Sequence, residues 1–149
     1  MRILGIDLGG RRTGVAVTDP TGTLAGGVEV VESTGLSDCA RQIMALLEKY
    51  GVSEVVLGYP VNMNGTLGES ARRVEKFRDI LEGLIEEKGG NIAVVLFDER
   101  LSSSLAHVYM NQTGIKGKER KNKVDMLSAQ IILQNYMDRK KIKNRGVDV

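Results

Sequence analysis

The residues best placed for chemistry in this sequence are carboxylates that stand next to apolar segments. Asp7 ends the first apolar run, Asp98 and Glu99 follow directly on a later one, and Asp125 heads a stretch of mainly apolar and small residues. Converging carboxylates repel one another and lose hydration unless a cation neutralises them, and oxygen ligands of this kind suit Mg²⁺ or Mn²⁺. Two such ions about 3.5–4 Å apart can activate a water and stabilise the leaving oxygen of a phosphodiester. The acids therefore predict metal-dependent phosphodiester hydrolysis.

Each acid also has a purely structural interpretation. Asp7 could accept backbone N–H bonds in the turn that follows it. Asp98, or one of the serines 102–104, could cap a following helix. Asp125 could favour a first helical turn, worth only about 0.3–1 kcal/mol. That interpretation leaves unexplained the helical face that follows this acid: Ser128, Ala129, Ile132 and Tyr136.

Other reactive residue types are too few to form a different kind of site. Cys39 is the only cysteine and His107 the only histidine, which excludes an internal disulfide and any multi-cysteine or histidine-rich metal site. Hydrolysis by metal ions needs no side-chain nucleophile. We therefore expect Cys39, His107 and the serines 102–104 to be core, helix-surface or capping residues.

The elements that must position the acids follow from hydrophobic periodicity and turn residues. Strands are expected at Arg2 to Leu8, Thr13 to Thr18 and Leu24 to Val31, and three consecutive strands make an antiparallel meander. A helix is expected next, with Ser37 as its cap and Tyr50 as its last residue, and then a short strand at 55–57. A second helix over 70–88 leads to a strand at 92–97 that is expected to be buried on both faces. The chain is then expected to form a helix over 102–112, a loop over 113–123 and a last helix over 124–139. This order predicts an α/β domain with a five-stranded mixed sheet, an antiparallel meander plus two parallel strands, flanked by helices.

The overall composition is that of one folded domain. The chain has 149 residues, of which 42% are hydrophobic, and this is enough for one sizeable core. Met1 to Asp7 contain no apolar run of signal-peptide length, and no later stretch is long enough to span a membrane. We therefore expect a single cytoplasmic domain over residues 1–149 that does not contact membranes.

Charge is distributed unevenly along the chain. Residues 1–99 hold 10 Lys and Arg against 15 Asp and Glu, whereas residues 100–149 hold 11 against 4 and end in a basic tail from about residue 140. A basic C-terminal third suggests a polyanionic partner. Charged helix faces that only keep the protein soluble are the alternative, and charge alone does not separate the two.

Four segments, taken in order, carry a family resemblance. They are Gly5-Ile6-Asp7-Leu8-Gly9 with Gly14-Val15-Ala16, Gly58-Tyr59-Pro60 with Gly65, Asp98-Glu99-Arg100-Leu101-Ser102, and Lys123-Val124-Asp125 with Ala129. Together they resemble the YqgF/RuvX family over essentially the whole chain. The resemblance implies a ribonuclease-H-like fold related to that of the Holliday-junction resolvase RuvC. It also implies a nuclease that acts as a resolvase or matures the small-subunit (16S) ribosomal RNA precursor.

The resemblance also assigns roles to the acids. Asp7, Glu99 and Asp125 match the catalytic, metal-holding acids of the family, and Asp98 is kept as a weaker metal ligand. Where the family commonly has two alanines after the last acid, this chain has Ser128-Ala129. Both residues are small, so close helix packing is expected to survive.

Nucleic-acid contacts are expected from basic and amide side chains. The candidates are Arg11, Arg12, Asn62, Asn64, Arg72, Arg73, Arg100, Lys116, Lys118, Arg120, Lys121 and Lys123. For the loop that holds the two asparagines, an ordinary connection is an equal alternative. Aromatic residues make up only 4% of the chain, so we expect recognition of the shape and backbone of structured RNA or branched DNA.

Two other classes of protein remain as alternatives. Asp7-Leu8-Gly9 also fits the first phosphate loop of sugar kinases, actin and Hsp70, but those proteins close a second domain over the nucleotide, and 149 residues cannot supply one. A noncatalytic RNA-binding assembly factor could use the basic C-terminal surface alone. The residues alone do not distinguish an RNA substrate from a DNA substrate. Both a monomer and a homodimer are possible, because a resolvase needs a two-fold dimer whereas a nuclease that trims RNA ends can act as a monomer.

Overall fold

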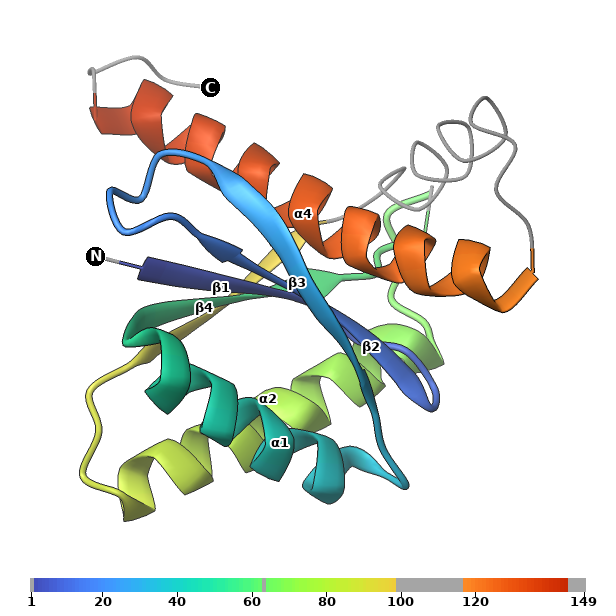
Figure 1. Ribbon diagram of the computed structural model, residues 1–149. Helices are drawn as coiled ribbons and strands as arrows, with labels where there is room; N and C mark the ends of the chain where they lie inside the picture. The colour runs from blue at the N-terminus through green and yellow to red at the C-terminus, as the bar shows by residue number, and fades with distance from the viewer. Residues whose placement is uncertain (1, 63, 99–116, 145–149) are drawn as a thin grey trace.

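The computed structural model describes residues 2–62, 64–98 and 117–144, which form one sheet with helices on both faces (Figure 1). The described elements are β1 (Arg2–Asp7), β2 (Arg12–Thr18), β3 (Ala25–Glu32), α1 (Leu36–Tyr50), β4 (Val52–Tyr59), α2 (Glu69–Glu87), β5 (Ala93–Asp98) and α4 (Gly117–Asn144). The expected helix over 102–112 lies outside the described residues.

The sheet has five strands in the order β3-β2-β1-β4-β5. The pairs β1–β2 and β2–β3 are antiparallel, and β1–β4 and β4–β5 are parallel. This confirms the predicted meander joined to two parallel strands. The two parallel strands follow α1 and α2, which act as the crossover helices. The carboxyl ends of β1, β4 and β5 therefore meet at one edge of the sheet.

The two faces of the sheet pack against different helices. Leu4 and Ile6 of β1 are fully buried in the core that α1 and α2 complete. Ile3, Ala16 and Val56 pack instead against α4 on the other face. Figure 1 shows this layering, with α1 and α2 together on one side of the sheet and α4 across the other. Strand alternation thus decides which helix each side chain meets.

The two crossover helices have the predicted apolar faces but differ in detail from expectation. Helix α1 begins after Gly35 without a side-chain cap, so the expected capping by Ser37 is wrong. Instead, the Thr34 N–H donates to the Asp38 carboxylate (3.0 Å) from the first turn of the helix. Gly51 ends the helix directly after Tyr50, with φ 61° in the left-handed region that suits glycine.

Helix α4 is longer than its apolar pattern predicted. It begins at Gly117 and ends at Asn144, so residues 117–123 of the expected loop and the start of the expected basic tail are helical. The physical reason is that lysine, arginine and glutamate are good helix formers. Because these charged residues show no hydrophobic periodicity, the sequence pattern did not reveal the first and last turns of the helix.

The last strand is an edge strand, although its apolar run predicted burial on both faces. Strand β5 has only β4 as a neighbour, and its residues are half-buried or exposed. Its neighbour β4 is buried on both faces in its middle, where Val55, Val56 and Leu57 are fully buried. An apolar run therefore did not distinguish the centre of this sheet from its edge.

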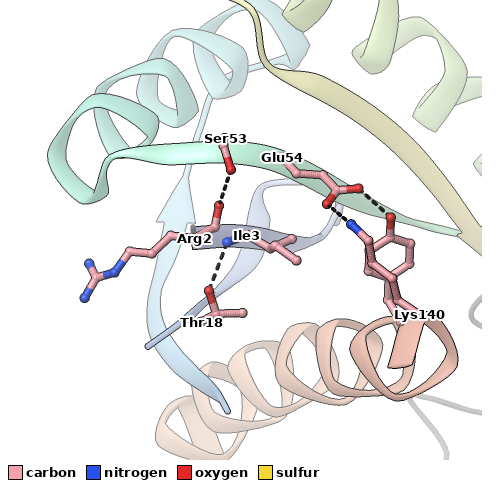
Figure 2. A network of polar contacts seen from close by, with 7 residues as sticks. Arg2, Ile3, Thr18, Ser53, Glu54 and Lys140 are labelled. Atoms are coloured by element: carbon pink, nitrogen blue, oxygen red, sulfur yellow. Dashed lines mark hydrogen bonds and ion pairs between the residues drawn. The ribbon is translucent and has the colours of Figure 1, made fainter. Parts of the chain in front are cut away.

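Helix α4 is fixed to the sheet by a polar network at the end remote from Asp7 (Figure 2). The Tyr136 hydroxyl donates to Glu54 of β4 (2.5 Å), and Lys140 pairs with the same carboxylate (2.9 Å). Burial and the Glu54 carboxylate raise the pKa of the Tyr136 hydroxyl, so it remains a donor. At this end Ile3 N–H donates to Thr18 Oγ1 (2.9 Å), which fixes β1 on β2.

No helix in the described part of the chain combines the length and the apolar character that crossing a bilayer requires.

Candidate functional site

The structure brings Asp7 and Asp125 together on one face of the sheet. Asp7 has the same strand parity as Ile3 and Gly5, which both face α4. Its antiparallel partner is Gly14 of β2, and paired residues share a face. A Cβ at Gly14 would lie 1.9 Å from the Asp125 carbonyl oxygen, so the backbone of Asp125 rests directly on Gly14. The backbone of Asp125 on α4 thus lies directly over the strand partner of Asp7.

Glycines on the neighbouring strands allow this close approach of α4. At Gly5, a Cβ would lie 2.7 Å from Leu133 Cβ. Ala129, between Asp125 and Leu133, is fully buried. A larger side chain at Gly5 or Gly14 would push the helix outward and carry Asp125 away from Asp7. The small residues of the sequence therefore determine how near the two acids come.

Arg12 supplies the positive charge next to Asp125. Its Nε lies 3.6 Å from Asp125 Oδ2, and the two side chains are 22% and 30% exposed. Arg12 begins β2 two residues before Gly14, so strand alternation places it on the same face. The sequence predicted a phosphate contact for Arg12, and the structure gives it an acidic partner from the candidate site.

The turn after Asp7 is held by Arg73 of α2. Its guanidinium donates to the carbonyl oxygens of Gly9 (2.5 Å) and Gly10 (3.2 Å). The turn is tight, because a Cβ at Gly9 would lie 1.8 Å from the Arg12 carbonyl oxygen. Sequence reasoning assigned Arg73 to phosphate, but these donors hold the backbone that carries Asp7. The planar fork of arginine suits two adjacent carbonyls better than an ammonium would.

Replacing Arg73 by lysine is expected to weaken the binding of Mg²⁺ by roughly tenfold, the lower end of losses seen for outer-shell partners. Lysine keeps the charge but not the two-pronged donation, so the position of Asp7 becomes less fixed. Calorimetric titration with Mg²⁺ measures this loss. Arg72→Lys on the same helix is the matched control, since Arg72 is exposed. Equal affinities for all three proteins would contradict a positioning role.

Asp98 lies apart from Asp7 and Asp125. Leu96 packs with α1 and α2 while Phe97 packs towards α4, so Asp98 has the parity of the α1 and α2 face. Strand β4 also separates β5 from β1, and two strand spacings are about 10 Å. Asp98, the weaker metal-ligand candidate, therefore lies on the opposite face of the sheet from Asp7 and Asp125.

Several predicted site residues have no described side chain. Glu99, Arg100 and Lys116 lie outside the described residues, and Lys118, Arg120 and Lys121 are placed only as backbone positions in the first turns of α4. Lys123 is exposed on the same helix. Within the described ranges no cluster of three Asp, Glu, His or Cys side chains is found. The described part of the site therefore consists of two of its three predicted acids.

The asparagines of the loop after β4 stabilise the loop itself. Asn62 Nδ2 donates to Thr66 Oγ1 (3.0 Å), and Asn64 Oδ1 accepts from the Thr66 hydroxyl (2.7 Å) and N–H (3.1 Å). A bridge between Val61 and Leu67 closes the loop. These contacts support the ordinary connecting-loop alternative for Asn62 and Asn64.

Cys39 and Ser128 are buried polar or reactive side chains outside the group of acids. Cys39 is buried in the α1 and α2 core, and burial raises the pKa of its thiol, which makes it a poor nucleophile. Ser128, one helical turn after Asp125, is 1% exposed, and its hydroxyl has no hydrogen-bond partner within the described structure. Sequence reasoning valued Ser128 only for its small size.

A five-stranded mixed sheet with two helices on one face and one long helix on the other is a ribonuclease-H-like architecture, and solved structures share it. T. thermophilus RuvC in complex with a Holliday junction superposes with a TM-score of 0.59 at 16% identity, covering 95% of this chain and 96% of that one. The fowlpox virus Holliday junction resolvase gives a TM-score of 0.57 at 16% identity, covering 93% and 99%. These likenesses show the fold.

The chain belongs to the RuvX family, described as Holliday junction resolvase, which matches residues 1–139. Its relatives include a protein of Ruminiclostridium cellulolyticum that is 42% identical over 93% of this chain and 95% of its own length. Another, from Acetivibrio thermocellus, is 40% identical over 94% and 97%. Both relatives carry the name "Putative pre-16S rRNA nuclease".

Proposed function

We propose that this protein is a metal-dependent nuclease that hydrolyses phosphodiester bonds in the precursor of 16S ribosomal RNA. The observation that carries the proposal is the seating of Asp125 on Gly14, the strand partner of Asp7. Membership of a resolvase family and relatives named for 16S rRNA maturation support the reaction and the substrate. A cytoplasmic location follows from this substrate, because ribosomal RNA is processed where bacterial ribosomes assemble.

The donor set fits a hard divalent cation such as Mg²⁺ or Mn²⁺. Asp7 and Asp125 supply carboxylate oxygens on the α4 face of the sheet, and the positively charged side chain of Arg12 lies beside Asp125. We propose that Glu99 is the third acid rather than Asp98, because Asp98 has the parity of the opposite face. When bound, the metal would supply activation of the attacking water and stabilisation of the leaving oxygen.

The chain's own contribution is to hold the acids and the substrate in place. Arg73 and the glycine turn fix the backbone after Asp7, and the packing of α4 fixes Asp125. Arg12 limits the repulsion between the carboxylates before substrate arrives. These contacts preorganise the site, so that little reorganisation accompanies the reaction.

The basic start of α4 is proposed to contact the phosphate backbone. Lys118, Arg120, Lys121 and Lys123 lie on the turns that lead directly to Asp125. The positive end of the helix dipole adds to the attraction for a polyanion. A backbone bound at these turns would run towards the two acids.

Replacing Lys118, Lys121 and Lys123 by glutamine is expected to weaken RNA binding and to reduce its salt dependence. If each lysine contacts one phosphate, the slope of log K against log salt becomes shallower by about 0.7–0.9 per lysine, or roughly 2–3 in all. Fluorescence anisotropy over a salt series measures it. The matched control replaces Lys49 of α1, Lys76 of α2 and Lys88 at the C-cap of α2, on the other face of the sheet. An equal change in both triple variants would assign the α4 lysines to general charge only.

A second candidate function is the resolution of branched DNA, which the family description favours. The two functions share the same acids and differ in substrate and symmetry, because a resolvase needs a two-fold dimer to cut both strands. A cleavage panel in Mg²⁺ with 16S rRNA precursor, an RNA duplex and a four-way DNA junction distinguishes them. Cleavage of the precursor alone, by a monomer, is the expected result. Symmetric cleavage of the junction by a dimer would favour the resolvase instead.

A further inference from the structure

A hollow of about 620 Å³ lies beside the candidate metal site, where β2 begins and β3 passes into α1. Its lining consists of Arg11, Arg12, Glu32, Ser33, Thr34 and Asp38. Arg12 belongs to both places, because its guanidinium also pairs with Asp125. A group bound in the hollow would therefore lie next to the reacting phosphodiester.

The walls of this hollow are held by the chain's own hydrogen bonds. Ser33 N–H donates to the Arg11 carbonyl oxygen (2.9 Å), which fixes the two chain segments to each other. The Asp38 carboxylate accepts from Thr34 N–H (3.0 Å) and from Gln42 Nε2 (3.2 Å). Asp38 is thus occupied in shaping the wall. The other charged lining groups are the guanidinium groups of Arg11 and of Arg12, which also pairs with Asp125, and the carboxylate of Glu32.

Glu32 is held in place but keeps its carboxylate exposed. Its carbonyl oxygen accepts from Gln42 Nε2 (2.9 Å), and its backbone pairs with Arg12 in the β2–β3 ladder. The side chain is exposed at the end of β3. Its carboxylate therefore borders the hollow from a fixed backbone, opposite the arginine that reaches Asp125.

The mixture of charges indicates what kind of ligand fits. Two arginines suit a phosphate, whereas a carboxylate repels a phosphate and accepts hydrogen bonds from hydroxyl groups. A ligand that satisfies both has a phosphate and a hydroxyl donor a short distance apart, as a ribonucleotide does. The 2′-hydroxyl is the donor that DNA lacks at this position. The volume lies within the range of small-ligand pockets.

We propose that this hollow binds one ribonucleotide of the substrate next to the cleavage point, with its phosphate on Arg11 and Arg12 and its 2′-hydroxyl donating to Glu32. The inference rests on the proposed nuclease function and deepens it, because it assigns the residues that would distinguish RNA from DNA. It also gives Arg12 two partners, the acid of the metal site and the neighbouring phosphate.

The test measures binding in EDTA, so that it does not depend on cleavage. The probe is a fluorescein-labelled RNA spanning a mature end of the 16S rRNA, in versions that carry a single 2′-deoxy substitution at successive positions. For the wild type, one position is expected to weaken binding about tenfold, as for loss of a hydrogen bond to a charged group. In Glu32→Ala, the same deoxy substitution is expected to change affinity less than twofold.

Controls separate this role from general charge effects. Glu48→Ala removes an exposed carboxylate on α1 and should keep the tenfold deoxy penalty. Arg11→Ala should weaken all versions of the RNA equally, since it removes a phosphate contact. Melting temperatures verify that each variant is folded.

The proposal is overturned if no single deoxy position weakens binding, or if the penalty is unchanged in Glu32→Ala. Failure of the nuclease proposal looks different. In that case the RNA is bound with the deoxy penalty intact, but Mg²⁺ produces no cleavage.

Discussion

Asp7→Asn is expected to abolish Mg²⁺-dependent cleavage while leaving the protein folded. Asparagine keeps the shape of the side chain at the end of β1 but removes the charge that would hold the cation. Loss of an outer-shell partner already costs up to about 100-fold in metal affinity or activity, and loss of a ligand should cost more than that. Cleavage of 16S rRNA precursor, measured under single-turnover conditions, checks the expectation.

The matched control for this substitution is Asp79→Asn. Asp79 is 73% exposed on α2, and its contact is an ion pair with Arg78 on the same helix. This variant should cleave at the wild-type rate. Near-wild-type cleavage by Asp7→Asn would remove Asp7 from the metal site. The noncatalytic RNA-binding alternative predicts instead that the wild type itself does not cleave.

Asp125→Ala is expected to eliminate both catalysis and the stabilisation of the fold by Mg²⁺. Alanine removes every side-chain oxygen, so the stability gained from a ligand that binds only the folded state disappears. In metal-free buffer the melting temperature should hardly change. Relief of repulsion between the acids and loss of the partly exposed ion pair with Arg12 act in opposite directions, and such a pair is worth only about 0–1 kcal/mol.

Thermal melts with and without Mg²⁺ measure this effect, and Asp138→Ala is the control. Asp138 is an exposed acid on the same helix, where it accepts a hydrogen bond from Gln134. The control should keep the full Mg²⁺ shift. If Asp125→Ala kept this shift and cleaved normally, Asp125 would be an ordinary first-turn acid. The metal would then have to be held from the end of β5.

The fold could be predicted from the sequence because its strands and crossover helices have clear periods. Turn residues separated the three strands of the meander. The helices before β4 and β5 predicted crossover connections, so that β4 pairs in parallel with β1 and β5 in parallel with β4. The pairing of Asp7 with Gly14 then follows from the tight turn at Gly9 and Gly10. The sequence also marked Asp125 as an acid on an otherwise packing face.

What could not be predicted depends on contacts between distant parts of the chain. Nothing local shows that Arg73 reaches the carbonyl oxygens of Gly9 and Gly10, more than sixty residues away. The side of the sheet on which Asp98 lies depends on register, since one residue of slip exchanges the faces. The hollow beside Arg12 arises where β3 meets α1, and only the fold brings Glu32 to it.

The glycines of the strands indicate where another part of the chain comes close, but the sequence alone does not show which part. Gly5 and Gly14 stand in strands, where glycine weakens the sheet unless another backbone must come close. One such close approach lies in the turn after Asp7, at Gly9. In the structure it also occurs in the middle of β1 and β2, where α4 lies against the strands. Two glycines on adjacent strands, together with a small-residue helix face, would have predicted this contact.

The most direct test of the proposed metal centre is the binding of Mn²⁺ in the absence of nucleic acid, followed by the electron paramagnetic resonance signal of the free ion. The wild type and Asp79→Asn are expected to deplete this signal equally as protein is added. The double variant Asp7→Asn with Asp125→Ala is expected to leave it unchanged, while its circular dichroism spectrum remains that of the folded protein. Depletion of the signal by the folded double variant to the same extent as by the wild type would contradict a metal centre built on these two acids.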